Sequence, residues 1–408
     1  MPAASRSPAV PLLVLIIAGC LIAAVTNGVR TSFGLFTLPM SGDLGISREG
    51  WAMAMAIQNL AWGIAQPFAG AVADRYGTAR VVAGGIVLYA GGVLLMAFSP
   101  NAGLLTLTAG IVVGVAIAIS SFSIVMAAFG RNVPAEKRSL YFGIATAASS
   151  FGQFLFAPIG QGFITAFGWQ QALILLALIL ITLLPLSYAL RGTAPKGVAG
   201  VDLGFMEAIS SAWRFSSYRL LVIGFFVCGF HIAFINVHMP AYLVQCGLSP
   251  EAGSWTIAVI GLFNIVGSLS AGYLGGRLPK QMLLATIYFT RAIAIALFVF
   301  LPVTEVTAYV FAATIGLLWL STVPLTAGLV SLFFGPRYMG MLYGIAFFSH
   351  QLGSFMGVWL GGFAFDQTGS YNLVWYLGIL LGLASAALHL PIRERKDPQF
   401  GAAMPAAA

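Results

Sequence analysis

The sequence predicts an all-α membrane protein with twelve transmembrane helices in two pseudo-symmetric six-helix halves. Three observations support this. The 408 residues are 60% hydrophobic and only 7% charged, with a mean hydropathy of +0.96. Soluble domains carry about 25% charged residues, so the solvent of most side chains here is lipid. The chain also divides into about twelve apolar runs, and its two halves resemble each other.

The apolar runs are long enough to cross a bilayer as helices, which takes about 20 residues each. Charged residues, prolines and glycines separate them. The first run is long, and a kink is expected before it ends near Pro39. We expect spans near residues 10–40, 51–73, 79–98, 102–129, 139–165, 170–190, 219–244, 252–275, 281–301, 306–334, 340–365 and 371–391.

The basic residues predict the orientation. An even number of spans places both termini on one side. If that side is the cytoplasm, all 19 lysines and arginines except Arg30, Arg48 and Arg291 are cytoplasmic, as the positive-inside rule requires. The net charge of +8 comes from scattered residues without a basic stripe, so no nucleic-acid partner is expected. We expect a multi-pass protein of the plasma (cell inner) membrane with both termini cytoplasmic.

An internal repeat predicts the domain organisation. The segment GIATAASSFG at 143–152 matches GIAFFSHQLG at 344–353, an offset of 201 residues, and Gly45 and Arg75 recur 202 positions later. We therefore divide the chain into residues 1–190, a cytoplasmic linker at 191–218 and residues 219–408. The linker is expected to contain a short amphipathic helix on the membrane surface, with an unstructured connection as the alternative. Two such halves with the same orientation are a transporter architecture, with the substrate site between them.

The loop GAVADRYGTAR at 70–80 carries a short motif. Its motif residues are Gly70, Asp74, Arg75, Gly77 and Arg80. Here the chain resembles the major facilitator superfamily of transporters over essentially its whole length. The resemblance implies that Asp74 braces the cytoplasmic gate against the start of the eleventh span; the alternative is that Asp74 and Arg75 only set topology. Gly110 stands where many proton-coupled drug exporters of the superfamily have an arginine, which disfavours that activity.

Polar side chains within the spans mark the expected binding site, since they usually face the interior of the bundle. Arg30 stands out, because every Asp and Glu falls in a loop, in a tail or at a span end. A mid-membrane arginine without a carboxylate predicts an anionic substrate. We expect Arg30 in the outer half of a central cavity, with Asn27, His231 and Asn264 as neighbours. The full candidate set is Asn27, Arg30, Gln58, Trp62, Gln153, His231, Asn264, Trp319, His350 and Ser354.

A narrower resemblance concerns the first two spans. TNGVRTSFGLFTLPM and ISREGWAMAMAIQNLAWG look like the monocarboxylate-transporter branch, including its bacterial members. In that branch a basic residue at the position of Arg30 engages the substrate carboxylate. Eukaryotic carriers of the branch also have an Asp and an Arg in span eight, where this chain has Asn264 and Ser268. The usual coupling carboxylate is therefore absent, and His231 and His350 become candidates for proton coupling.

These observations favour a secondary active transporter of a small organic anion, most simply a monocarboxylate, working by alternating access as a monomer. Rival activities are anion exchange of the oxalate–formate type, export of amphipathic compounds, or a non-transporting membrane receptor. No pattern indicates an enzyme, a cofactor or a metal site, and the three cysteines are dispersed. Two structural alternatives stay open. Arg30 could bond helix carbonyls, and Arg291, whose role the sequence leaves uncertain, is expected to do so.

Overall fold

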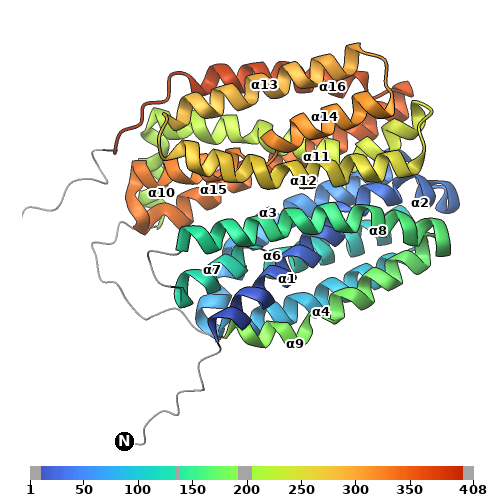
Figure 1. Cartoon of the computed structure of the whole chain (residues 1–408), viewed down its shortest axis with the longest axis horizontal. Helices are drawn as coiled ribbons and strands as arrows, with labels where there is room; N and C mark the ends of the chain where they lie inside the picture. The colour runs from blue at the N-terminus through green and yellow to red at the C-terminus, as the bar shows by residue number, and fades with distance from the viewer. Residues whose placement is uncertain (1–10, 121, 134–137, 192–204, 398–408) are drawn as a thin grey trace, which may run out of the picture.

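The computed structural model describes residues 11–120, 122–133, 138–191 and 205–397. Within these ranges the chain is a bundle of helices without strands. Two groups of helices lie side by side, one from the first half of the chain and one from the second (Figure 1).

The first half contains the helices α1 to α9 with short 3₁₀ and π segments. Several spans of this half are interrupted. The sequence predicts an interruption only in the first span. Their bounds are α1 Leu12–Thr31, η1 Phe33–Phe36, α2 Thr37–Leu44, α3 Arg48–Tyr76, α4 Thr78–Met96, α5 Ala102–Leu105, η2 Thr106–Val112, α6 Val113–Ser120, α7 Phe122–Asn132, α8 Arg138–Ile181, α9 Leu184–Ser187 and η4 Tyr188–Leu190.

The second half begins after α10, a short helix in the segment between the halves. Ala208 and Ala212 are buried in α10, while Trp213 is 44% exposed. Residues 192–204, the rest of the expected linker, lie outside the described part of the chain. The bounds are α10 Phe205–Arg214, α11 Ser216–Gln245, α12 Pro250–Gly275, α13 Lys280–Phe300, α14 Glu305–Leu318, α15 Thr322–Thr368 and α16 Asn372–His389.

The helices account for twelve spans. Within the described residues, nine stretches are long and apolar enough to cross a membrane, and one of them, Tyr141–Leu190, holds two spans. The helix α3 and the second part of α15 complete the twelve. Gly168 in α8 and Gly335 in α15 have φ of 79° and 75°, where a side chain is disfavoured, so the chain turns there between consecutive spans.

Equivalent glycines let equivalent helices approach in the two halves. A Cβ at Gly152 in α8 would overlap the carbonyl oxygen of Ala24 in α1, and a Cβ at Gly353 in α15 would overlap that of Phe226 in α11. The glycines are 201 residues apart and their partners 202. A second pair of contacts repeats at an offset of 202: Gly114 on Gln58 and Gly316 on Ile260. The internal repeat of the sequence is therefore a repeat of helix packing.

Candidate functional site: a cavity between the two halves

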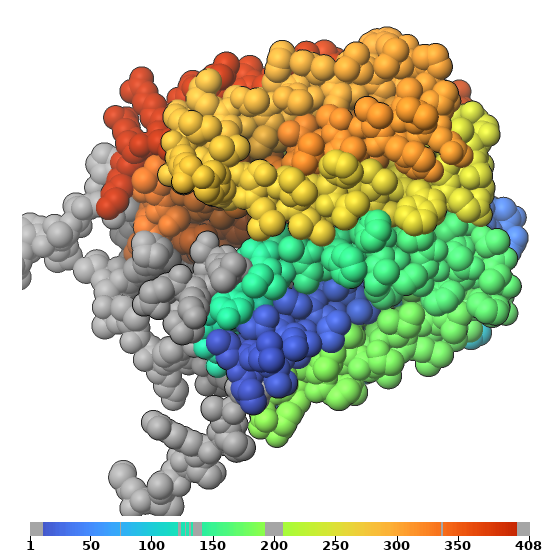
Figure 2. Space-filling view, viewed as in Figure 1, coloured from blue at the N-terminus to red at the C-terminus, as the bar shows by residue number. Residues whose placement is uncertain are grey.

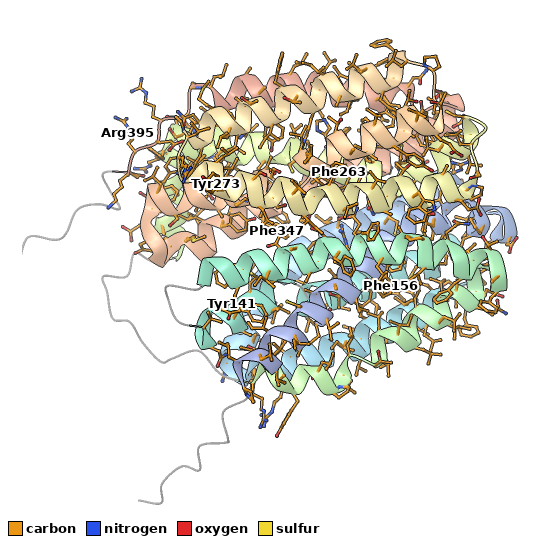
Figure 3. The ribbon with its side chains drawn as sticks, in the orientation of Figure 1. Tyr141, Phe156, Phe263, Tyr273, Phe347 and Arg395 are labelled. Carbon is orange, nitrogen blue, oxygen red and sulfur yellow. The ribbon has the colours of Figure 1, made fainter. Side chains whose placement is uncertain are left out.

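A cavity lies where the two halves meet, with about 850 Å³ of empty space including the part open to solvent. Eight of the ten predicted site residues line it: Asn27, Arg30, Gln58, Trp62, Gln153, Trp319, His350 and Ser354. Phe347, also in the lining, lies in the space between the halves (Figure 3). The structure thus brings together polar groups that the sequence places on five separate spans.

Arg30 is held at the edge of the cavity by its own half of the molecule. It lies in the last turn of α1, just before the 3₁₀ segment η1 interrupts the first span. Its Nη2 donates to Oδ1 of Asn59 at 2.8 Å, and its guanidinium lies 4.7 Å from the ring centre of Trp62. Its Nε is buried without a hydrogen-bond partner among the described residues. The cation is oriented, but its hydrogen-bonding capacity is not used up.

Asn59 links Arg30 to the other half. Its amide nitrogen donates to the Met55 carbonyl at 2.8 Å, which leaves Oδ1 for Arg30. Its backbone carbonyl accepts a 3.0 Å hydrogen bond from Nε2 of Gln351 in α15. Oε1 of Gln351 is 3.0 Å from Nδ1 of His350. A chain of hydrogen bonds therefore runs from the cation in α1 to the histidine in α15.

Aromatic rings form one wall of the cavity, starting at the guanidinium. The Trp62 ring meets Phe347 edge-on at 5.3 Å, and its Nε1 donates to Gln66 at 2.8 Å. Phe347 stacks on His350 at 5.8 Å with an interplanar angle of 7°, and His350 lies 4.9 Å from Phe225. The wall crosses from α3 to α15 and α11, so both halves contribute to it.

The amide side chains of the lining are engaged with the backbone. Each amide nitrogen donates to a carbonyl oxygen, and several of these bonds join different helices. The pairs are Asn27 with Ser149 (3.0 Å), Gln58 with Ala109 (2.8 Å), Asn59 with Met55 (2.8 Å), Gln153 with Ile257 (3.4 Å) and Asn236 with Thr31 (3.4 Å). Ala109 lies in the π segment η2, where a carbonyl leaves the regular helical pattern.

Two predicted site residues do not line the cavity, and the expectation that they neighbour Arg30 is wrong. Nε2 of His231 bonds the Gly378 carbonyl at 2.8 Å, inside the second half between α11 and α16. Asn264 donates to Ser150 at 2.9 Å and accepts from the Leu320 backbone N–H at 3.0 Å. His231 lies on the face of α11 that packs against α16, whereas Ile232 and Asn236 lie on the face that lines the cavity.

Arg291 has a structural explanation. The tenth span breaks between α14 and α15, which frees carbonyl groups at the end of α14. Nη2 of Arg291 donates to the Leu318 carbonyl and, at 2.5 Å, to the Trp319 carbonyl. Asn264 satisfies the Leu320 N–H at the same break. The two side chains stabilise a break that places Trp319 and Leu320 in the cavity wall.

Sequence reasoning missed several lining residues. Asn59 follows the candidate Gln58 directly but is not in the candidate set. Ile232 and Asn236 lie in the same span as the candidate His231, and neither is in that set. Phe225 and Phe347 carry no polar signal at all. A cavity that is largely apolar is found only when helices are placed around it.

One end of the seam between the halves is closed by polar contacts. Asp366, in α15, accepts hydrogen bonds from the backbone N–H groups of Arg48 (3.1 Å) and Glu49 (2.8 Å) in the first turn of α3. Glu49 accepts from Nε1 of Trp359 at 3.1 Å, and Nη1 of Arg48 donates to the Tyr371 hydroxyl at 2.8 Å. A carboxylate at a helix N-terminus is favourable, so we call these five residues the latch.

The opposite end of the seam is looser. At Gly70 in α3 and at Gly340 and Gly344 in α15, an added Cβ would meet none of the described atoms within 4 Å. In the space-filling view, α12 lies against α8 along the seam, which is hollowed toward its left-hand end (Figure 2). The latch contacts therefore close one end of the seam, and the hollow lies toward the other end.

The loop motif lies at that looser end. Gly77, with φ of 93°, joins α3 to α4 in a conformation that favours glycine. Arg75 and Arg80 are exposed, and Arg75 lies 5.3 Å from the ring of Tyr76. The side chain of Asp74 lies outside the described part of the chain, so its gate role stays a prediction.

Comparisons with known proteins agree on the family. The model of the Major Facilitator Superfamily matches residues 15–358. The chain is 26% identical to the MFS-type transporter YcxA of Bacillus subtilis (strain 168), covering 89% of this chain and 91% of that protein. It is 25% identical to monocarboxylate transporter 13 of Rattus norvegicus, covering 86% and 81%.

Solved structures share the fold. A bacterial homologue of the human lysosomal transporter Spinster, inward-facing and occupied, has a TM-score of 0.74 at 12% identity, covering 94% of this chain and 98% of that one. A D-xylose-proton symporter has a TM-score of 0.71 at 15% identity, covering 94% and 97%. The family match, the twelve spans and the packing repeat lead to one conclusion: this chain is a multi-pass membrane transporter, not an enzyme, and belongs to the major facilitator superfamily.

Proposed function

We propose that the protein carries a small organic anion, a monocarboxylate, across the membrane by alternating access. The observation that carries the proposal is Arg30, a half-buried cation at a cavity between the halves. In the described part of the chain, no Asp or Glu is among the residues that line this cavity. A carboxylate is the counter-charge that a guanidinium binds best, through two parallel hydrogen bonds.

Two further points support a monocarboxylate. Relatives at low identity are named monocarboxylate transporters 11, 12 and 13. The cavity also offers one arginine, which suits one carboxylate. With the orientation predicted from the basic residues, the latch lies on the outer face of the plasma (cell inner) membrane and the open end faces the cytoplasm. The transporter would work as a monomer, with the halves rocking about the cavity.

The test is uptake into liposomes containing the purified protein. Labelled monocarboxylates should enter these liposomes faster than protein-free ones, and Arg30→Gln should abolish the difference. Export or exchange is read from the same liposomes, preloaded with anion. Failure of every organic anion to cross, in either direction, would contradict the proposal.

Proton coupling, if present, is expected to run through His350, since His350 lines the cavity and His231 does not. Histidine is the side chain suited to carry a proton near neutral pH. His350→Gln should remove the dependence of uptake on an inward proton gradient, while His231→Gln should keep it. Unchanged gradient-driven uptake in H350Q would contradict this assignment and favour exchange, or a proton carried on the substrate itself.

The latch should control access from its side of the membrane. Asp366→Asn removes the charge that accepts two N–H groups of α3, which costs about 1 kcal/mol at a helix cap. The open state on that side should become about fivefold more populated. The population of this open state is measured by the rate at which an impermeant maleimide labels a cysteine introduced in the cavity. The reporter is Val237→Cys, in a chain whose own cysteines are replaced. Glu305→Gln, at the start of α14, is the control; equal labelling rates in both variants would exclude the latch.

A further inference from the structure

We infer that the carried monocarboxylate has an aromatic body and bears neither a second charge nor a chain of hydroxyl groups. This inference rests on the proposed function, because it places the carboxylate on Arg30. It concerns the remainder of the molecule, which must lie against the other residues of the cavity. Three features of the lining define what that remainder can be.

The first feature is the charge of the lining. Among the described residues, Arg30 is the one arginine of the lining, which contains no lysine, Asp or Glu. A dicarboxylate would bury its second carboxylate with neither a lysine nor a second arginine beside it, and an amino acid would bury its ammonium group without an acid. Burying an unpaired charge is costly. The lining therefore selects an acid with a single charge.

The second feature is the aromatic wall next to the cation. Trp62 lies 4.7 Å under the guanidinium and 5.3 Å from Phe347, and Phe347 stacks on His350. A planar acid bound to Arg30 extends along these rings, which come from both halves. Aromatic pairs favour such edge and offset contacts beyond the area they bury.

The third feature is the engagement of the amides. Each of the five amide nitrogens of the lining donates a hydrogen bond to a backbone carbonyl, and Oδ1 of Asn59 accepts from Arg30. Oδ1 of Asn236 is buried without a hydrogen-bond partner among the described residues. A sugar acid would bury many hydroxyl groups, each needing a partner. Most of the remaining lining is apolar, including Met55, Ile232, Leu320 and Val323. Such a surface suits a ring better than a polyol.

The experiment measures binding to the full-length purified protein by titration calorimetry, using acids matched in pairs. The reference is 3-phenylpropanoate. Phenylalanine adds only an ammonium group to it, succinate has a carboxylate in place of the methyl group of butyrate, and gluconate adds hydroxyls to hexanoate. We expect 3-phenylpropanoate to bind about tenfold or more tightly than lactate, because its ring is buried against rings. Phenylalanine, succinate and gluconate should each bind more weakly than their partners.

Variants at Phe347 test the wall itself. Phe347→Ala should weaken 3-phenylpropanoate about tenfold while changing lactate much less. Phe347→Leu keeps an apolar side chain without the ring and should show an intermediate loss. The control is Phe289→Ala in α13, where the ring is 50% exposed and away from the cavity.

The outcomes separate the two proposals. Arg30-dependent binding of lactate or gluconate that is tighter than that of 3-phenylpropanoate would overturn the aromatic substrate and leave anion transport standing. Equal loss of both acids in F347A would also overturn it. Failure of all these acids to bind in an Arg30-dependent way would remove the proposed function and this inference with it.

Discussion

Replacing Arg30 by Gln is expected to lower the affinity for the carried anion by at least about thirtyfold, because losing one partner of a buried charged pair costs about 2–5 kcal/mol. The folded protein should be no less stable. Among the described residues, the charge that Gln removes has no acidic partner in the cavity lining, and its Nε has no hydrogen-bond partner. Binding is measured by titration calorimetry, and folding by thermal unfolding of the same sample in detergent.

Arg30→Lys separates charge from shape. Lysine keeps the positive charge but loses the planar fork that binds both carboxylate oxygens, and it stacks less well on Trp62. Its affinity should fall between those of wild type and Arg30→Gln. Arg277→Gln makes the same change of net charge at an exposed position over Tyr273, far from the lining. If R30Q bound the anion like R277Q, Arg30 would not be the anion site.

Gly353→Ala is expected to destabilise the second half by about 3 kcal/mol, at the upper end for an overpacked position. The added Cβ would overlap the backbone carbonyl of Phe226, and a backbone atom cannot rotate away as a side chain does. The helices α11 and α15 would have to separate along their contact. The midpoint of thermal unfolding in detergent reports the effect, and Gly152→Ala should act in the same way on α1 and α8.

The matched control lies on the same helix. Gly344, nine residues before Gly353 in α15, has open space where a Cβ would lie. Gly344→Ala should therefore leave the midpoint unchanged or raise it slightly, since alanine favours a helix by about 1 kcal/mol over glycine. Equal midpoints for G353A and G344A would show that the close packing of α11 on α15 does not limit stability.

The sequence by itself determined the fold class, since composition and the length of the apolar runs leave few alternatives in lipid. A mean hydropathy of +0.96 with 7% charged residues requires helices whose backbone groups are satisfied within each segment. It also indicated a kink in the long first run, and it indicated the repeat, in which Gly152 and Gly353 lie in matching segments. These features are local or repeat at a fixed spacing, so they are visible in the order of the residues without knowledge of which helices touch.

The sequence also singled out Arg30, because a charge between apolar neighbours is conspicuous wherever the helix is placed. Its partner was not readable. Asn59 lies in another span and Gln351 in the other half, and nothing in their own neighbourhoods marks them as a pair. Which helix faces meet is decided by packing over the whole bundle.

Tertiary structure alone decided the roles of His231 and Asn264, whereas the sequence already favoured bonds from Arg291 to helix carbonyls. His231 and Asn264 are polar groups in spans, and the sequence analysis places both in the same candidate set as His350. The break between α14 and α15 frees backbone groups that Arg291 and Asn264 satisfy, while α16 supplies the Gly378 carbonyl to His231. A buried polar group must find a partner, and whether a backbone carbonyl, a neighbouring helix or a cavity takes that place depends on contacts between residues far apart in the chain.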